Sequence, residues 1–330
     1  DIINKRDKYI KGNILIIDQC IPTPREDSGS KDMDNIIQAI LDLNYRPHLF
    51  ALSNRGETLE TDIYYKKGVH CIFGEEHINF KSFIKKYGDT FEKIIISRVN
   101  SYEEISPDLI KFSPNSYKLF YTVDLHHIRL KSEFKKTKNG LVNSEYKRTK
   151  VNEINAIHAT DKTIVLSDKE KFYLVDECNI PSDKIDVWPL IRNEIDNLDN
   201  FKKLKKSDDI IFIGGFRHTP NIQAVKLLER EILPKVKELF GKAGISYPIV
   251  KIYGSQPNEY IKNLDNEYLS YQGFIENEED AFSSARISLA PIPFGSGMKG
   301  KTLSSLIYKT PIVGSSFAFE GFQIFPEKIA

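Results

Sequence analysis

Short apolar runs alternate with amphipathic stretches along most of the chain, and this alternation restricts the fold more than any other feature. The run at 13–19 (NILIIDQ) is typical of a buried strand, and apolar residues at helical spacing follow from Ser30. The run at 46–52 (RPHLFAL) is the next expected strand. A strand, a helix and a strand in this order form a βαβ unit. Such units predict a parallel sheet that binds ligands at the carboxyl ends of its strands.

The same alternation continues through both halves of the chain. In the first half we expect a helix at 80–87 and strands within 68–73, 93–99, 118–130, 162–174 and 184–190. In the second half we expect strands within 209–216, 247–255, 268–273, 286–292 and 311–313, and helices at 221–240, 277–285 and 302–309. Residues 192–209 are polar and almost free of apolar side chains. The 330 residues are therefore expected to form two α/β domains, at 1–191 and 210–330, joined by a linker at 192–209.

Composition favours an ordinary soluble protein. Hydrophobic residues make up 40% and charged residues 28%, and the formal net charge of +1 gives no indication of nucleic-acid binding. Cys20, Cys71 and Cys178 are far apart, which predicts neither a disulfide framework nor a metal site. No apolar run approaches the ~20 residues of a membrane span, and no signal peptide is recognisable. We expect a cytoplasmic protein. Because the sequence starts at Asp1 and ends soon after a strand, we also expect a fragment of a longer chain or a trimmed one.

A glycine-rich loop between a strand and a helix is the clearest candidate for a binding site. Gly295, Gly297 and Gly300 follow the strand, with Lys299 and Lys301 among them. A glycine loop that directs backbone N–H groups from a helix N-terminus binds anions, above all phosphate. The two lysines strengthen this interpretation.

The same loop also spells a P-loop. Gly295, four residues and then Gly300, Lys301 and Thr302 read G-x4-G-K-T. A P-loop normally follows the first strand of its domain, but only 28 residues remain after Thr302. We therefore prefer a phosphate-bearing ligand held by a different fold. A nucleoside triphosphatase and a purely structural turn are the alternatives.

Three other stretches have a functional and a structural interpretation. Polar residues at 124–127 (DLHH) end a buried strand, where parallel sheets bind ligands, although they could also cap a turn. The D-x-D spelling at 32–34 occurs in metal–nucleotide sites, but acids are common in the first turn of a helix. The basic segment 131–150 is expected to be a solvated helix and a mobile loop. Its alternative is contact with an anionic acceptor or with the inner face of a membrane.

The order and spacing of these motifs resemble the retaining glycosyltransferases called group 1 or family 4, which have the GT-B fold. The matching elements span about 13–321: the loop at 22–30, D-L-H-x-x-R at 124–129, V-S-x-x-E within 163–170, W-P at 188–189, G-G-F at 214–216, H-x-P-N at 218–221, a strand ending at Gly254, Y-Q-G-F at 271–274, the glycine loop within 291–303, P-I-V at 311–313 and F-E-G at 319–321.

The resemblance implies two Rossmann-like domains with parallel sheets facing each other across a cleft. A nucleotide sugar would bind mainly to the second domain and a glycan, lipid-linked or protein acceptor mainly to the first. Transfer would proceed with retention, in the synthesis of surface polysaccharide or glycoconjugate. Neither a metal nor another cofactor is expected, because cationic side chains and helix ends stabilise the leaving diphosphate in such proteins.

The resemblance also implies roles for individual residues. The expected catalytic residues are Asp124, His126, Arg217 and Lys301. The expected donor-binding residues are Gly29, Ser30, Gly215, Phe216, His218, Asn221, Phe274, Ile275, Gly297, Met298, Lys299, Gly300, Thr302 and Glu320. Among these, Phe274 and Ile275 would lie near the nucleobase, and the ribose would lie near the start of the 302–309 helix.

Two departures from the family pattern stand out. Many members carry a Glu-x7-Glu pair around the glycine loop, whose second glutamate normally holds the ribose hydroxyls. Here the first position falls in the loop at Phe294 and Gly295, and the second falls near Ser304. An expected lysine after Arg217 is replaced by Gln223, and the family's C-terminal helices lie beyond the sequence. These departures favour one alternative, a catalytically degenerate nucleotide- or sugar-binding module of a larger protein.

Overall fold

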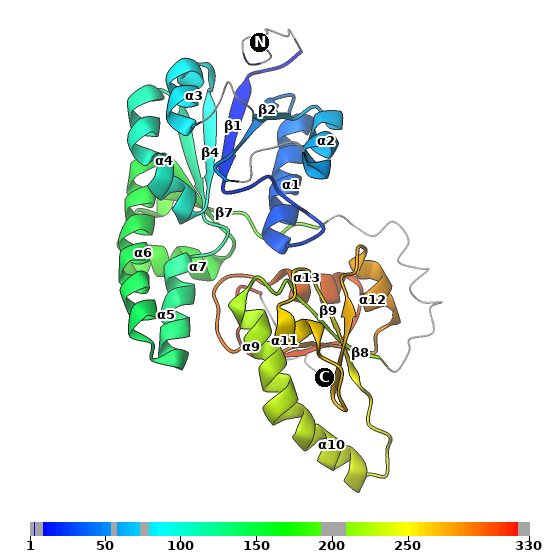
Figure 1. The fold of residues 1–330 in the computed structure, drawn as a ribbon. Helices are drawn as coiled ribbons and strands as arrows, with labels where there is room; N and C mark the ends of the chain where they lie inside the picture. Colours follow the sequence, from blue (N-terminus) through cyan, green and yellow to red (C-terminus); the bar gives the residue numbers. More distant parts are fainter. Residues whose placement is uncertain (1–2, 4–8, 54–57, 73–78, 193–208, 323–330) are drawn as a thin grey trace. The chain divides into compact units, whose positions relative to one another are not determined.

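The computed structural model describes residues 3, 9–53, 58–72, 79–192 and 209–322. The chain divides into two compact units, one formed by Asp1–Pro24 and Gly29–Pro189 and the other by Arg25–Ser28 and Leu190–Ala330. Each unit holds one parallel sheet covered by helices (Figure 1). Apart from its two end residues, the expected linker at 192–209 lies outside the described residues. The expected cleft concerns both units together and stays a prediction.

The first unit contains a seven-stranded sheet in which every neighbouring pair of strands is parallel. Its strands are β1 (Asn13–Asp18), β2 (Arg46–Ala51), β3 (His70–Ile72), β4 (Lys93–Ser97), β5 (Tyr117–Tyr121), β6 (Lys162–Val165) and β7 (Ile185–Val187). The order is β3-β2-β1-β4-β5-β6-β7. The direction of winding reverses between β1 and β4, and this switch point is where open parallel sheets typically bind ligands.

Helices cover both faces of this sheet. They are α1 (Ser28–Asp42), α2 (Leu59–Lys66), α3 (Phe80–Tyr87), α4 (Val99–Phe112), α5 (His126–Thr137), α6 (Gly140–Ala159) and α7 (Asp168–Phe172), with short turns η2 (Gly88–Thr90), η3 (Tyr173–Glu177) and η4 (Ser182–Lys184). Figure 1 shows α1 and α2 on one side of the strands and α3, α4 and α6 on the other. The apolar side chains of β1 and β4 pack against the buried stripes of α3, α4 and α6, as a two-sided sheet requires.

The second unit contains a five-stranded parallel sheet in the order β10-β9-β8-β11-β12. Its elements are β8 (Ile210–Ile213), α9 (Thr219–Leu227), η5 (Leu228–Ile232), α10 (Leu233–Lys242), β9 (Val250–Tyr253), α11 (Glu259–Lys262), β10 (Leu269–Gly273), α12 (Glu278–Ser284), β11 (Ile287–Ala290), α13 (Gly300–Ile307) and β12 (Ile312–Gly314). Phe212 packs with residues of α9 and α11, and Ile211 packs with residues of α12. Two small apolar clusters thus hold helices against the sheet.

The strand expected within 118–130 is β5, which ends at Tyr121 before the polar residues, and Val123 adopts a left-handed backbone conformation (φ 65°) where the chain turns into α5. The structure corrects one expectation about the first unit. The mobile loop expected within 131–150 is wrong, since α5 and α6 leave only 138–139 between them. α5 and α6 thus form a helical hairpin. The polar composition of this segment gave little sign of two helices, because each of them buries only a few residues. Among the described residues, no helix is long and apolar enough to cross a membrane.

Candidate functional site

The glycine loop lies between β11 and α13 at the carboxyl end of the second sheet. Gly297 has φ 70°, in the left-handed region that favours glycine. The helix begins at Gly300, two residues earlier than expected, with Lys299 at its N-cap and no side chain capping the first turn. The loop therefore leads into a helix N-terminus that the side chain of its N-cap residue does not cap, and such an end suits an anion.

The Lys301 side chain contacts two groups of neighbouring elements, Phe212 on β8 and Asn221 on α9. Its Nζ donates to Asn221 Oδ1 at 2.7 Å and lies 4.3 Å from the centroid of the Phe212 ring. Burial, and secondarily repulsion from Lys299, lowers the pKa of Lys301 to about 7. A bound anion would favour the charged form of Lys301 and raise its pKa again, so anion binding and protonation of this lysine are coupled.

Glycines allow this close arrangement around Lys301. A Cβ atom on Gly214 would lie 2.8 Å from Asn221 Cγ and 3.0 Å from Lys301 Nζ. A Cβ on Gly254 would lie 1.9 Å from the carbonyl oxygen of Gly214. Asn221 also donates through Nδ2 to the carbonyl oxygen of Gly215 at 2.8 Å. The β8–α9 turn and α9 therefore meet α13 around one ammonium group, and the end of β9 packs tightly against that turn.

Arg217 and His218 lie in the exposed turn between β8 and α9. Arg217 Nε donates to Gln256 Oε1 at 2.6 Å, and His218 is the N-cap residue of α9 without a side-chain cap bond. These two side chains face solvent, whereas Lys301 is enclosed. The structure thus brings two of the expected site residues, Lys301 and Asn221, into contact. Arg217 instead bonds to Gln256.

Three expected donor-binding side chains are engaged within the fold. The Phe216 ring is buried against Phe212 and Tyr271 in the core. Thr302 Oγ1 donates to the carbonyl oxygen of Ala318 at 2.7 Å and is fully buried. Lys299 Nζ donates to carbonyl oxygens of its own loop, those of Ser296 at 2.7 Å and Gly297 at 2.6 Å. Phe216 and Thr302 could therefore reach a ligand only through their backbone.

The engagement of Thr302 bears on the P-loop interpretation. A P-loop threonine uses its hydroxyl as a ligand of magnesium. Here that hydroxyl bonds a backbone carbonyl, and the loop follows β11, the fourth of the five strands in chain order. Both observations favour an anion site of another kind.

The remaining expected donor residues lie in other parts of the two units. Phe274 follows β10 with 45% of its surface exposed, and Ile275 packs beside Phe282. Met298 lies half-buried in the glycine loop, and Glu320 follows β12 in a turn. Gly29 and Ser30 begin α1, and the side chain of Ser30 is buried.

In the first unit, Asp124 joins a histidine and an arginine at the carboxyl end of β5. His126 Nε2 and Asp124 Oδ1 are 2.9 Å apart, and Arg129 Nε donates to Asp124 Oδ2 at 2.9 Å. Burial alone would raise the pKa of Asp124, but Arg129 and His126 hold it well below its usual value. Asp124 is therefore an ionised carboxylate that orients the His126 ring.

Glu153 fixes the same segment from α6. Its carboxylate accepts from the backbone N–H groups of His126 at 2.8 Å and His127 at 3.0 Å, and it lies 2.5 Å from His127 Nδ1. His127 Nε2 also lies 3.0 Å from the Tyr173 hydroxyl. His127 and Glu153 are fully buried, so His127 is structural. Sequence reasoning missed Glu153, because a glutamate just after a basic segment gives no local signal of burial.

Two more groups at this sheet edge were not anticipated as functional. Glu170 lies in the first turn of α7, where the N-cap side chain of Ser167 accepts from its backbone N–H, and its carboxylate accepts from the N–H of Leu166 at 3.0 Å. Burial, and secondarily the charge of Asp124, raises the pKa of Glu170 to about 7. Arg98 has a left-handed backbone (φ 70°), and its guanidinium pairs with the buried Asp18 at the β1/β4 switch point. Strained residues of this kind often mark ligand sites.

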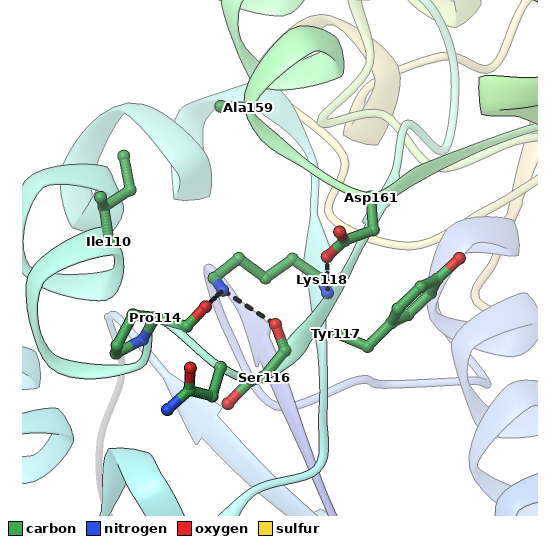
Figure 2. A pocket seen from close by; sticks show the side chains of 8 residues that line it. Ile110, Pro114, Ser116, Tyr117, Lys118, Ala159 and Asp161 are labelled. Atoms are coloured by element: carbon green, nitrogen blue, oxygen red, sulfur yellow. Dashed lines mark hydrogen bonds between the residues drawn. The ribbon is translucent and has the colours of Figure 1, made fainter.

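A cavity of about 380 Å³ lies at the opposite, amino end of β5 and β6 and carries no comparable chemistry (Figure 2). Lys118 Nζ donates to the carbonyl oxygen of Ser116 at 2.8 Å, and Asp161 accepts from the backbone N–H of Lys118. These groups bond the backbone. Among the described residues, no cluster of His, Cys, Asp and Glu could hold a metal ion, and Asp34 of the D-x-D motif pairs with Lys67 at 2.7 Å.

Comparisons with known proteins identify the fold. No protein-family model and no curated protein matches the sequence. Among solved structures, HepE of Anabaena in complex with UDP and glucose covers 92% of this chain and 81% of its own, with a TM-score of 0.63 and 10% identity. The chain has the GT-B fold. TarM is also similar to it, with a TM-score of 0.65 and 10% identity, and covers 96% of this chain and 87% of its own. A glycosyltransferase from Rickettsia africae has a TM-score of 0.58 and 14% identity and covers 95% of this chain and 81% of its own.

These similarities confirm the α/β fold expected from the sequence, with two parallel sheets and alternating helices. Identities of 10–14% support the fold alone. Retention, the donor, the acceptor and the roles of individual residues belong to the proposal that follows.

Proposed function

We propose that this chain is a glycosyltransferase that moves a sugar from a nucleoside-diphosphate sugar to a glycan, lipid-linked or protein acceptor, with retention. The observation that carries the proposal is the enclosed Lys301 with its lowered pKa, beside an uncapped glycine loop at the carboxyl end of a GT-B sheet. A helix N-terminus with an adjacent cation is suited to a diphosphate. Solved GT-B structures similar to this chain contain UDP and glucose, or UDP-glucose.

The proposed mechanism assigns charge stabilisation to the second unit and positioning to the first. As the bond between sugar and diphosphate breaks, negative charge develops on the diphosphate. Lys301, the backbone N–H groups near Gly300 and Arg217 would stabilise that charge. His126, oriented by Asp124, would contact a donor hydroxyl or the acceptor at the sugar. No metal or other cofactor takes part in this proposal.

Nucleotide binding is the first test of this function. We expect one of UDP, GDP, ADP, CMP and dTDP, without added metal, to raise the melting temperature clearly above the effect of the others. A ligand at 100 times its Kd stabilises a protein by about 2.7 kcal/mol, which a thermal-shift assay detects. UDP is the first expectation because it occupies the similar structures of HepE. If none of the five produced a shift, the proposed donor site would be wrong.

Two alternatives make different predictions. A catalytically degenerate module, which the serine at position 304 favours, would bind a nucleotide sugar without releasing the nucleotide. A nucleoside triphosphatase would release inorganic phosphate from ATP or GTP in the presence of magnesium and would lose this activity on Lys301→Ala. Products of a single incubation therefore separate the three functions.

We further propose that the α5–α6 hairpin contacts an anionic membrane surface, where a lipid-linked acceptor would be reached. Its tip carries the exposed Lys135, Lys136 and Lys138, and Leu141 has 80% of its surface exposed. Lysines surrounding an exposed apolar side chain suit a surface of anionic headgroups over acyl chains.

Liposome binding tests this contact. The triple variant with Lys135, Lys136 and Lys138 changed to Gln is expected to bind phosphatidylglycerol vesicles about 100-fold more weakly, since each lysine near such a surface contributes about 1 kcal/mol. The matched control changes the three exposed lysines of α3, Lys81, Lys85 and Lys86, to Gln. Equal sedimentation of both variants with the vesicles would contradict the membrane contact.

A further inference from the structure

Glu278 links the first turn of α12 to α13. The Ser304 hydroxyl donates to Glu278 Oε2 at 2.8 Å. Ser304 has only 3% of its surface exposed, whereas Glu278 is half-buried. The Phe282 and Tyr308 rings, stacked with centroids 5.5 Å apart, hold the two helices together beside this contact. The carboxylate is therefore fixed by a buried donor at the surface of the second unit.

The proposed function places this carboxylate between two parts of a nucleotide. The family resemblance implies a base near Phe274 and Ile275, which precede α12, and the proposed function puts the diphosphate at the glycine loop that leads into α13. In a nucleotide the ribose is covalently bonded between base and phosphate, so it must lie between these two segments. α12 and α13 pack against each other there, and Glu278 is a carboxylate of α12 that accepts a hydrogen bond from α13.

We propose that Glu278 binds the ribose hydroxyls of the donor nucleotide and that Ser304 orients its carboxylate. The inference rests on the proposed function. A carboxylate accepts hydrogen bonds from neighbouring ribose hydroxyls, as acidic residues do in dinucleotide-binding sheets. Ser304 lies on α13 and uses its one O–H donor on Glu278. The acceptor for the ribose has thus moved from α13 to α12, and Ser304 positions it.

Paired ribo- and deoxyribonucleotides test this assignment. Isothermal titration would compare UDP, GDP and ADP with their 2′-deoxy counterparts on the wild type, on Glu278→Gln and Glu278→Ala, and on the control Asp280→Asn in the same helix. We expect the wild type to prefer the ribonucleotide by about 10-fold or more. Glu278→Ala should weaken ribonucleotide binding about 10- to 100-fold and remove that preference. Glu278→Gln can still accept from Ser304, so it keeps the fold while losing the charge.

The outcomes separate this inference from the proposed function. If the wild type binds a nucleotide and both Glu278 variants keep the same preference for the ribose form, this inference is overturned and the proposed function stands. If the wild type binds none of the nucleotides, the proposed function is overturned and this inference with it. Asp280→Asn is expected to titrate like the wild type. A preference that Asp280→Asn loses as completely as Glu278→Ala does would also overturn the assignment to Glu278.

Discussion

Replacing Lys301 with Ala is expected to weaken the binding of the donor nucleoside diphosphate by about 1–3 kcal/mol, which corresponds to about a 5- to 150-fold rise in Kd. The reason is that Lys301 Nζ lies on Asn221 and over the Phe212 ring, where an anion gains a charge-assisted hydrogen bond shielded from water. Titration calorimetry measures the effect. The control is Lys262→Ala, because this lysine is exposed on α11. An unchanged Kd in the Lys301 variant would remove this residue from the donor site.

The pH dependence gives Lys301 a second signature. Burial lowers its pKa to about 7, so the free protein loses this charge as the pH rises above 7. A bound diphosphate favours the charged form, and we expect the affinity to fall by up to about 10-fold per pH unit above pH 7. Lys301→Met should remove this slope, whereas a slope that survives in Lys301→Met would contradict the assignment.

Folding stability should change in the opposite direction over the same range. Burial lowers the folded-state pKa of Lys301 to about 7, below the ordinary lysine value of 10.5. Between these values the unfolded chain binds more protons than the folded chain, so the contribution of Lys301 to stability rises with pH. Below pH 7 both states are protonated and the dependence ends. The difference in melting temperature between the wild type and Lys301→Met, followed with pH, measures this term.

Replacing His126 with Ala should slow sugar transfer about 100- to 1,000-fold while nucleotide affinity changes less than about twofold. His126 begins α5, where Glu153 holds its backbone and the ionised Asp124 holds its ring. Such double support is typical of a side chain that must be accurately oriented. Rates at saturating donor, together with Kd for the nucleotide, separate chemistry from binding.

A second histidine provides the control for this prediction. His158 is exposed near the end of α6 and should tolerate Ala without a change in rate. Asp124→Asn should lower the rate as His126→Ala does, because the ring then loses its charged partner. If His126→Ala transferred sugar as fast as the wild type, the assignment of the first-unit site would fail while the fold remained.

Much of the fold could be predicted because the sheet strands are short, apolar and separated by amphipathic helices. The helix expected at 80–87 has these bounds in the structure. The glycine loop was also predictable, since its residues are consecutive. Contacts between distant positions were not. Glu153 and His126 are 27 residues apart, and Asp18 and Arg98 are 80 apart, so no local pattern reports either pair.

Burial was the other property that local patterns reported poorly. Phe216 and Thr302 belong to recognisable motifs, and the family resemblance alone placed them among the donor-binding residues. The structure places both inside the fold, because each must also pack behind the loop that it helps to form. Glu278 shows the converse. It resembles any exposed acid in the first turn of a helix until α13 places Ser304 against it.

The most direct measurement is the release of nucleoside diphosphate from nucleotide sugars by the purified protein, followed by chromatography of the products. The account predicts release from at least one nucleotide sugar of the base selected by the binding screen, faster with a suitable acceptor, and strongly reduced in Lys301→Ala and His126→Ala. A protein that binds the nucleotide but releases none from any of its sugars, with or without acceptors, would contradict the proposed transferase and leave a binding module.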